Sequence, residues 1–188
     1  MKTFELAGEV RTLTGKKAAK ILRKQNLIPC NLYGTGENIM FTVKADDVRK
    51  LIYTPDTMVV ELAIGGKKHN TVVKELQFHP ISDDVLHIDF LEVNEQKPVT
   101  VEIPVQLEGH AEGVKAGGKL SLDMRKLKVN GIYTQIPNRI VVDVTNLGLG
   151  KRIAVGDIQV EGLRFMNPQD ACVAQVKATR ASAAAAAE

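Results

Sequence analysis

The chain has 188 residues, 44% of them hydrophobic, so it is long enough to bury the core of one large domain or two small ones. Aromatic residues make up only 4% and tryptophan is absent, which argues against a single-strand binder built on stacked aromatic side chains. No stretch approaches the roughly 18 apolar residues of a membrane span, and the first ten residues lack the apolar run of a signal peptide, so we expect a soluble, cytoplasmic protein.

Positive charge is concentrated near the N-terminus. The formal net charge of the chain is only +3, yet residues 11–24 hold six basic residues and no acidic one. This short segment therefore carries more positive charge than the whole protein does net. Local charge of this kind usually has a polyanion opposite it.

The first predicted elements are a strand and a basic helix. Apolar residues at even positions from Phe4 to Val10 predict the strand. Residues 14–25 predict a short helix, because a Thr-Gly start is followed by good helix formers. On a helical wheel its basic residues fall within an arc of roughly 120°, opposite an apolar face that we expect to be packed. The five basic residues are Lys16, Lys17, Lys20, Arg23 and Lys24. The alternatives are a solvated surface helix and a helix that contacts phosphates, and the missing acids favour the second.

The remainder of the first half is predicted to add five strands and one helix. A helix through residues 48–52 can be capped by Asp46 or Asp47. Gly65-Gly66 separates two apolar runs and is a hairpin signal. The predicted strands span residues 27–33, 39–43, 57–64, 69–78 and 85–93. With the first strand this gives six strands within residues 1–93, enough for a small closed or partly closed barrel. Cys30 lies in one of the apolar runs, so we expect a small core residue.

The residue pattern of the sequence changes after residue 93. Residues 94–98 are interpreted as a linker, and residues 99–178 alternate aliphatic and polar residues between frequent glycines, which predicts an all-β domain. Residues 179–188 form a low-complexity, alanine-rich tail. The predicted fold is therefore mainly β with two or more short helices: an N-terminal six-stranded barrel followed by a C-terminal β-domain.

The segment His87-Ile88-Asp89-Phe90 is the other feature that points to chemistry. On a strand, His87 and Asp89 share one face and the two apolar residues share the other. In an RNA-binding protein His87 would donate to a phosphate or base, and Asp89 would accept from a base amino group or a 2′-hydroxyl. In an enzyme the same pair would be an oriented general base. An exposed His–Asp pair of no consequence is the third alternative.

Nothing else in the sequence supports an enzyme. Gly117-Gly118-Lys119 is followed by Leu120 and so lacks the hydroxyl residue of a phosphate-binding loop, and no nucleophile elbow is present. The four histidines and two cysteines match no zinc spacing. We therefore expect no catalytic residues, no metal and no cofactor. Tyr33, at the end of a predicted strand, is either a core residue or a contact to an RNA backbone.

Taken together, these residues resemble the bacterial large-subunit ribosomal protein L-twenty-five family, in its long CTC-type two-domain form. The order and spacing of several motifs in both halves of the chain carry the resemblance. They are Arg11, Gly15-Lys16, Leu22-Arg23, Ile28-Pro29, Leu32-Tyr33-Gly34, His79-Pro80, residues 87–90, residues 103–109, residues 111–120 and residues 136–147.

The resemblance implies a structural constituent of the large ribosomal subunit, located in the central protuberance, whose N-terminal barrel binds 5S rRNA. Neighbouring ribosomal proteins and rRNA would be further partners, with no membrane and no small-molecule substrate. Carried over position by position, the RNA-binding residues are Arg11, Lys16, Lys20, Arg23, Tyr33, His87 and Asp89, and Lys17 and Lys24 are secondary candidates. The alternatives are a regulatory module for another structured RNA and an RNA phosphodiesterase that uses His87 and Asp89.

Overall fold

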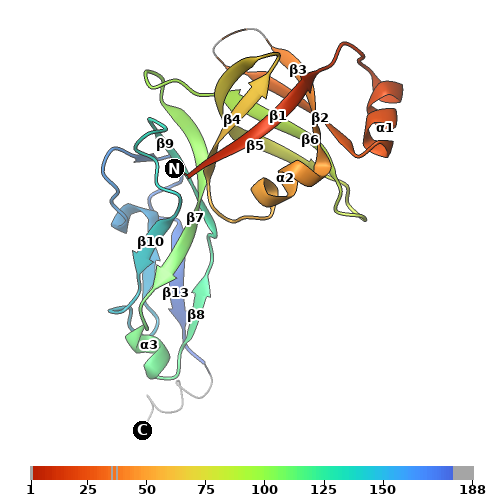
Figure 1. Ribbon diagram of the computed structural model, residues 1–188. Coiled ribbons are helices and arrows are strands. Elements are labelled where there is room, and N and C mark those ends of the chain that lie inside the picture. The colour runs from red at the N-terminus through yellow and green to blue at the C-terminus, as the bar shows by residue number, and fades with distance from the viewer. Residues whose placement is uncertain (1, 35, 37, 180–188) are drawn as a thin grey trace. The chain divides into compact units, whose positions relative to one another are not determined.

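The computed structural model describes residues 2–34, 36 and 38–179, which form two compact units (Figure 1). The first unit comprises Met1–Val101 and Ile132–Thr134, and the second comprises Glu102–Gly131 and Gln135–Glu188. Apart from Thr179, the predicted alanine-rich tail lies outside the described residues.

The first unit is built on a closed barrel of six strands. They are β1 (Lys2–Val10), β2 (Leu27–Tyr33), β3 (Ile39–Lys44), β4 (Met58–Ile64), β5 (Lys67–Phe78) and β6 (Val85–Glu92). The order around the barrel is β1-β3-β2-β6-β5-β4. β4 pairs with β1 and β2 pairs with β6 in parallel, whereas the other neighbours are antiparallel. The predicted six-stranded barrel is thus confirmed, and closure leaves no unpaired sheet edge.

Alternating apolar residues of these strands fill the barrel. Phe41 and Phe90 are fully buried, with their ring centroids 5.6 Å apart. Leu62 and Ile88 are buried beside them in the same cluster. Cys30 is also fully buried, as predicted, and burial raises the pKa of its thiol far above the ordinary value. This residue is therefore a core side chain and not a reactive thiol.

Helix α1 (Lys16–Lys24) lies beside the barrel wall and is supported mainly by β2 (Figure 1). Gly15, at its N-cap, has φ of 99°, a conformation that favours glycine. None of the helix residues is fully buried, and Ile21 is 56% exposed. The prediction that the apolar face of this helix is packed is therefore wrong for Ile21. A single strand is too narrow to cover the whole apolar side of the helix. Ala18, Ala19 and Leu22 are covered in part.

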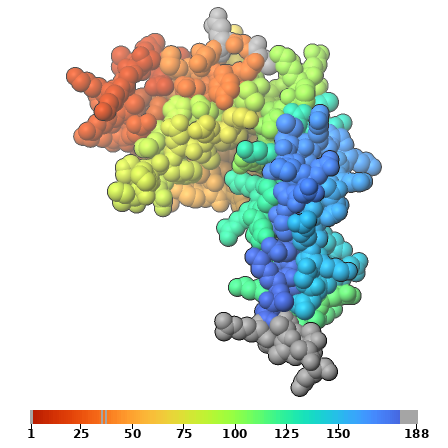
Figure 2. All heavy atoms as spheres, turned by 180° about the vertical axis from the view of Figure 1, so that it is seen from behind, coloured from red at the N-terminus to blue at the C-terminus, as the bar shows by residue number. Residues whose placement is uncertain are grey.

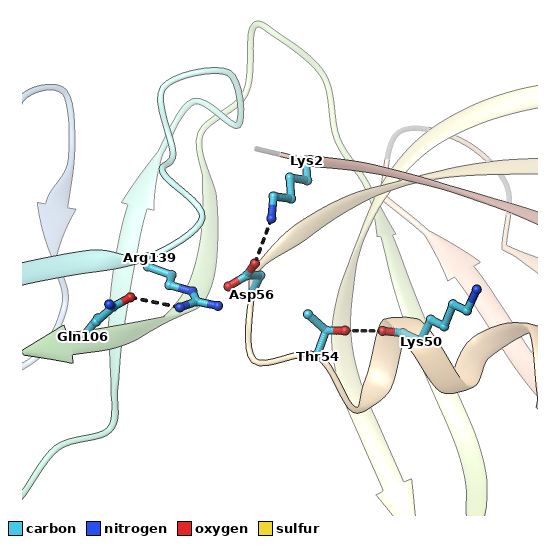
Figure 3. A network of polar contacts seen from close by, with 6 residues as sticks. All are labelled: Lys2, Lys50, Thr54, Asp56, Gln106 and Arg139. Atoms are coloured by element: carbon cyan, nitrogen blue, oxygen red, sulfur yellow. Dashed lines mark hydrogen bonds and ion pairs between the residues drawn. The ribbon is translucent and has the colours of Figure 1, made fainter.

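Helix α2 (Ala45–Ile52) buries Val48 and Leu51 against the barrel. It begins two or three residues earlier than a cap at Asp46 or Asp47 requires, so both aspartates lie in its first turn and no side chain caps it. Asp46 instead accepts a hydrogen bond from Asn26 Nδ2 at 3.2 Å. Just beyond the helix, the Thr54 hydroxyl donates to the backbone oxygen of Lys50, and Lys2 pairs with Asp56 at 3.3 Å (Figure 3).

The second unit consists of two small sheets. Its strands are β7 (Val99–Glu108), β8 (Lys119–Leu122), β9 (Lys126–Gly131), β10 (Ile140–Asp143), β11 (Arg152–Ala154), β12 (Arg164–Phe165) and β13 (Cys172–Lys177). One sheet has the order β10-β7-β9-β12 and the other β11-β13-β8. Arg139 Nη1, just before β10, donates to Gln106 Oε1 of β7 at 2.9 Å (Figure 3).

The predicted C-terminal β-domain is confirmed, with two additions. A single helical turn, α3 (Glu112–Lys115), and a 3₁₀ turn (Val155–Asp157) interrupt the strands. Elements this short have no periodic pattern that a sequence could reveal. Among the described residues, no helix has the length and apolar character needed to cross a bilayer.

Candidate nucleic-acid interface

A row of polar side chains runs across the outside of the barrel on β2, β6 and β5. The strand register places Asn31 beside Asp89, and Asp89 beside Glu75. Two residues earlier on β6, His87 lies beside Gln77 of β5. We call these five residues the outer polar strip. Their outward direction follows from the strand alternation, because Ile88, between His87 and Asp89, is fully buried in the core.

His87 and Asp89 form a loose pair within this strip. His87 Nδ1 lies 3.5 Å from Asp89 Oδ1, and the two side chains are 18% and 21% exposed. Burial lowers the pKa of His87, and the positive charges of Arg11 and Arg23 lower it further, whereas Asp89 and Glu75 oppose the shift. His87 is therefore neutral at pH 7, with one ring nitrogen able to donate and the other able to accept.

Two buried polar atoms on this side of the barrel lack a partner. Arg11 follows β1 and is fixed through its backbone N–H, which donates to the Met40 oxygen at 3.0 Å. Its Nε atom is buried, as is Asn31 Oδ1, and neither forms a hydrogen bond within the described residues. Buried polar atoms are rarely left unpaired, since each costs about 1–3 kcal/mol. An unmet donor and an unmet acceptor therefore favour a polar ligand on this surface.

Tyr33, at the end of β2, is a surface residue. Tyr33 is 37% exposed, so the alternative that it is a core residue is wrong. Partial burial and the neighbouring carboxylates of Asp89 and Glu75 raise the pKa of its hydroxyl. The hydroxyl therefore stays protonated and can donate.

Helix α1 presents its lysines to solvent. Lys16, Lys17, Lys20 and Lys24 are all exposed. In Figure 2 the segment that contains α1 (red) stands out from the surface of the first unit. In the part of the chain that the structure describes, no acidic side chain forms a salt bridge with any of the four. Their charge is therefore free to interact with phosphates.

Arg23 also anchors α1 to the barrel, a role that the sequence does not show. Its Nε and Nη2 atoms both donate to the backbone oxygen of Leu86, at 3.1 and 2.9 Å. Leu86 directly precedes His87 on β6, so this contact ties the C-terminal end of α1 to the strand that carries the His–Asp pair. Arg23 thus connects the cationic helix to the outer polar strip.

We expect Arg23→Ala and Arg23→Lys to loosen α1 to a similar extent. Lysine keeps the charge but cannot reproduce the two-donor contact to Leu86. Amide hydrogen exchange in residues 16–24 should therefore accelerate in both variants, by the several-fold that losing about 1 kcal/mol of local stability allows. Normal exchange in the lysine variant would show that charge alone, and not the contact, holds the helix.

The lowered pKa of His87 predicts a pH dependence of stability. The unfolded chain takes up this proton near pH 6.5, whereas the folded chain takes it up only at lower pH. The contribution of neutral His87 to folding stability is therefore fully present above the ordinary histidine pKa. It is lost as pH falls toward the lower pKa of His87 in the folded chain. Between about pH 7 and pH 5, the free energy of unfolding should fall less in His87→Gln than in the wild type. Identical slopes in denaturant titrations would contradict the burial of a neutral His87.

The structure brings most of the predicted residues together. Arg11, Arg23, Tyr33, His87 and Asp89 are linked by electrostatic contact, and the four lysines lie on the adjoining helix. Sequence reasoning missed Asn31, Glu75 and Gln77, because only the strand register shows that they lie beside the His–Asp pair. Within the described residues, no three His, Cys, Asp or Glu side chains are grouped so as to hold a metal ion.

A closed barrel with a cationic helix beside a polar strand face is a small β-barrel protein whose surface suits a polyanion. Residues 6–90 match the model of the ribosomal L25p family, and residues 98–180 match the C-terminal domain of ribosomal protein TL5. The chain therefore belongs to the ribosomal L25p family, in its long two-domain form. This membership assigns it a structural role in the ribosome and confirms that it is not an enzyme.

Relatives match over the full length of the chain. The large ribosomal subunit protein bL25 of Porphyromonas gingivalis is 54% identical over 188 residues, which cover 99% of this chain and 98% of the relative. The proteins of the same name from Phocaeicola vulgatus and Bacteroides thetaiotaomicron are 52% and 49% identical, each covering 100% of this chain and 98% of the relative.

Proposed function

We propose that the chain binds 5S rRNA through α1 and the outer polar strip, as a structural component of the central protuberance of the large ribosomal subunit. The observation that carries the proposal is the cationic face of α1, which forms no salt bridge with an acid among the described residues and is joined through Arg23 to the polar strip. The choice of 5S rRNA rests on the resemblance of these positions to the L-twenty-five family.

The chemistry of the two surfaces suits double-helical RNA. An A-form helix hides its base edges in a deep, narrow major groove and displays 2′-hydroxyls and base edges in a wide, shallow minor groove. The lysines of α1 would neutralise phosphates, whereas His87, Asp89 and Tyr33 would face the groove. Arg11 and Asn31 have an unmet donor and acceptor for the same ligand.

We further propose a division of labour along the chain. Residues 1–93 would make the 5S rRNA contact, residues 94–98 would act as the linker, and residues 99–178 would contact neighbouring ribosomal proteins or rRNA. The separate match of residues 98–180 to a second domain model supports this division.

Competition binding tests the choice of RNA. Labelled 5S rRNA bound to the full chain is challenged with unlabelled 5S rRNA or with an unrelated duplex RNA of similar length, at physiological salt. We expect 5S rRNA to compete at least about a hundredfold better, since specific complexes exceed non-specific ones by several orders of magnitude. Equal competition would instead indicate a general or regulatory duplex-binding module.

A further inference from the structure

Asn26 follows the last turn of α1 in a backbone conformation that few residue types adopt. Its φ is 63°, in the left-handed region that glycine and asparagine enter most readily. A residue of this kind commonly ends a helix. The Asn26 N–H donates to the Arg23 oxygen at 3.2 Å, and the Asn26 oxygen accepts from the Ala45 N–H at 2.9 Å. The backbone of Asn26 therefore joins the end of α1 to the start of α2.

The side chain of Asn26 adds a third contact between these two helices. Its Nδ2 atom donates to Asp46 Oδ2, in the first turn of α2, at 3.2 Å. Glycine at this position would keep the left-handed backbone but would have no side chain, and aspartate would have no N–H to donate. Asparagine thus combines the backbone conformation with the donor, and neither of these alternatives does so.

The two helices differ in how firmly packing holds them. α2 buries Val48 and Leu51 in the core of the barrel, whereas α1 has no buried residue. Because packing fixes α1 only weakly, its direction depends on polar contacts at its C-terminal end. They are the contact from the Arg23 side chain to the Leu86 oxygen and the contacts of Asn26 to α2.

We propose that Asn26 is a positioning residue for RNA binding, which acts through Asp46 to fix the direction of α1 and of the lysines on it. The inference rests on the proposed function and extends it from residues that touch the RNA to one that does not. A helix that already has its binding direction need not be ordered when the RNA binds, which raises affinity without adding a contact.

Asn26→Gly should weaken 5S rRNA binding about fivefold, which is the effect that one hydrogen bond of ordinary strength allows. The substitution removes the bond to Asp46, so the RNA must order α1 when it binds. All lysines of α1 remain and meet the same phosphates, so the salt slope should not change. Binding titrations at several salt concentrations measure both quantities. An affinity equal to that of the wild type, or a slope flatter by about one unit, would contradict the proposal.

Asp46→Ala and Asp46→Asn form a matched pair that tests whether Asn26 acts through Asp46. Both remove the same negative charge, but only the asparagine variant keeps a side-chain oxygen that can accept from Asn26 Nδ2. We expect Asp46→Ala to bind 5S rRNA about fivefold more weakly than Asp46→Asn. In the Asp46→Ala background, Asn26→Gly should have little further effect, because the bond is already absent. Equal affinities of the matched pair, or full additivity in the double variant, would overturn the proposal.

Residual dipolar couplings of the amides in residues 16–24 measure the direction of α1 without any RNA. In the wild type they should fit one direction relative to the barrel amides, and in Asn26→Gly they should be reduced while the barrel couplings stay the same. Unchanged couplings in α1 would reject the role of Asn26. A loss of overall stability alone would not reduce the couplings of the folded protein, so this measurement separates positioning from a general effect on folding.

The same measurement separates the failure of this proposal from the failure of the proposed function. If the wild-type protein does not prefer 5S rRNA over an unrelated duplex RNA, the proposed function fails, and the couplings still decide whether Asn26 directs α1. If the wild type does prefer 5S rRNA, and Asn26→Gly matches it in affinity and in couplings, only the role of Asn26 is rejected.

Discussion

Replacing Lys16 and Lys20 together with alanine is expected to weaken 5S rRNA binding by about 50-fold at about 0.1 M salt. Each lysine that neutralises a phosphate releases a condensed counterion, so losing two should flatten the plot of log affinity against log salt by about two units. Both side chains are exposed on α1 without an acidic partner among the described residues. Binding titrations at several salt concentrations measure both quantities.

The fold of this variant should be unaffected. Alanine is the best helix former, and the substitution also removes a like-charge pair spaced four residues apart. Lys50→Ala with Lys67→Ala is the control, because it removes the same charge from exposed positions outside α1. An unchanged salt slope in the α1 variant, or an equal loss in the control, would show that these lysines do not contact phosphates.

Phe90→Ala is expected to lower the free energy of unfolding by about 3–5 kcal/mol. The side chain is fully buried in the barrel, where its ring packs 5.6 Å from that of Phe41, measured between centroids. Removing it deletes apolar contacts and leaves a cavity that a closed barrel cannot collapse to fill. All three tyrosines of the chain belong to the first unit, so tyrosine fluorescence in a denaturant titration reports on this unit.

Phe78→Ala provides the same chemical change at a different depth. Phe78 ends β5 and is 42% exposed. Its loss should lower the free energy of unfolding by less than about 1 kcal/mol. Equal destabilisation in the two variants would mean that the stability of the barrel does not depend on the Phe41–Phe90 pair.

The strands of the barrel could be predicted because each has one buried face. Alternation in β1 and in the residues around Phe90 records which side chains point inward, and the glycine pair after β4 marks the turn. The same alternation placed His87 and Asp89 on the outer face. Helix boundaries leave a weaker pattern in the sequence, and α2 begins before Asp46 and Asp47, which the sequence suggests as its caps.

The parts of the site that could not be predicted depend on which strands are neighbours. Asn31 and Glu75 have no local pattern that sets them apart, and they join the site only because β2 and β5 flank β6. The register of β5 against β6 also shifts beside Glu75, and this shift has no signature in the sequence either. The bond from Arg23 to Leu86 joins residues 63 positions apart, so a helical wheel shows the charge of Arg23 but not its anchoring role.

The most direct test of the central claim is to map the RNA-binding surface of the full chain by NMR, through chemical-shift changes on addition of 5S rRNA. If the chain binds through α1 and the outer polar strip, the changes concentrate in α1, at Arg11, at the end of β2 and around His87 and Asp89. Changes confined to residues 99–178, with α1 and the outer polar strip unperturbed, would contradict it.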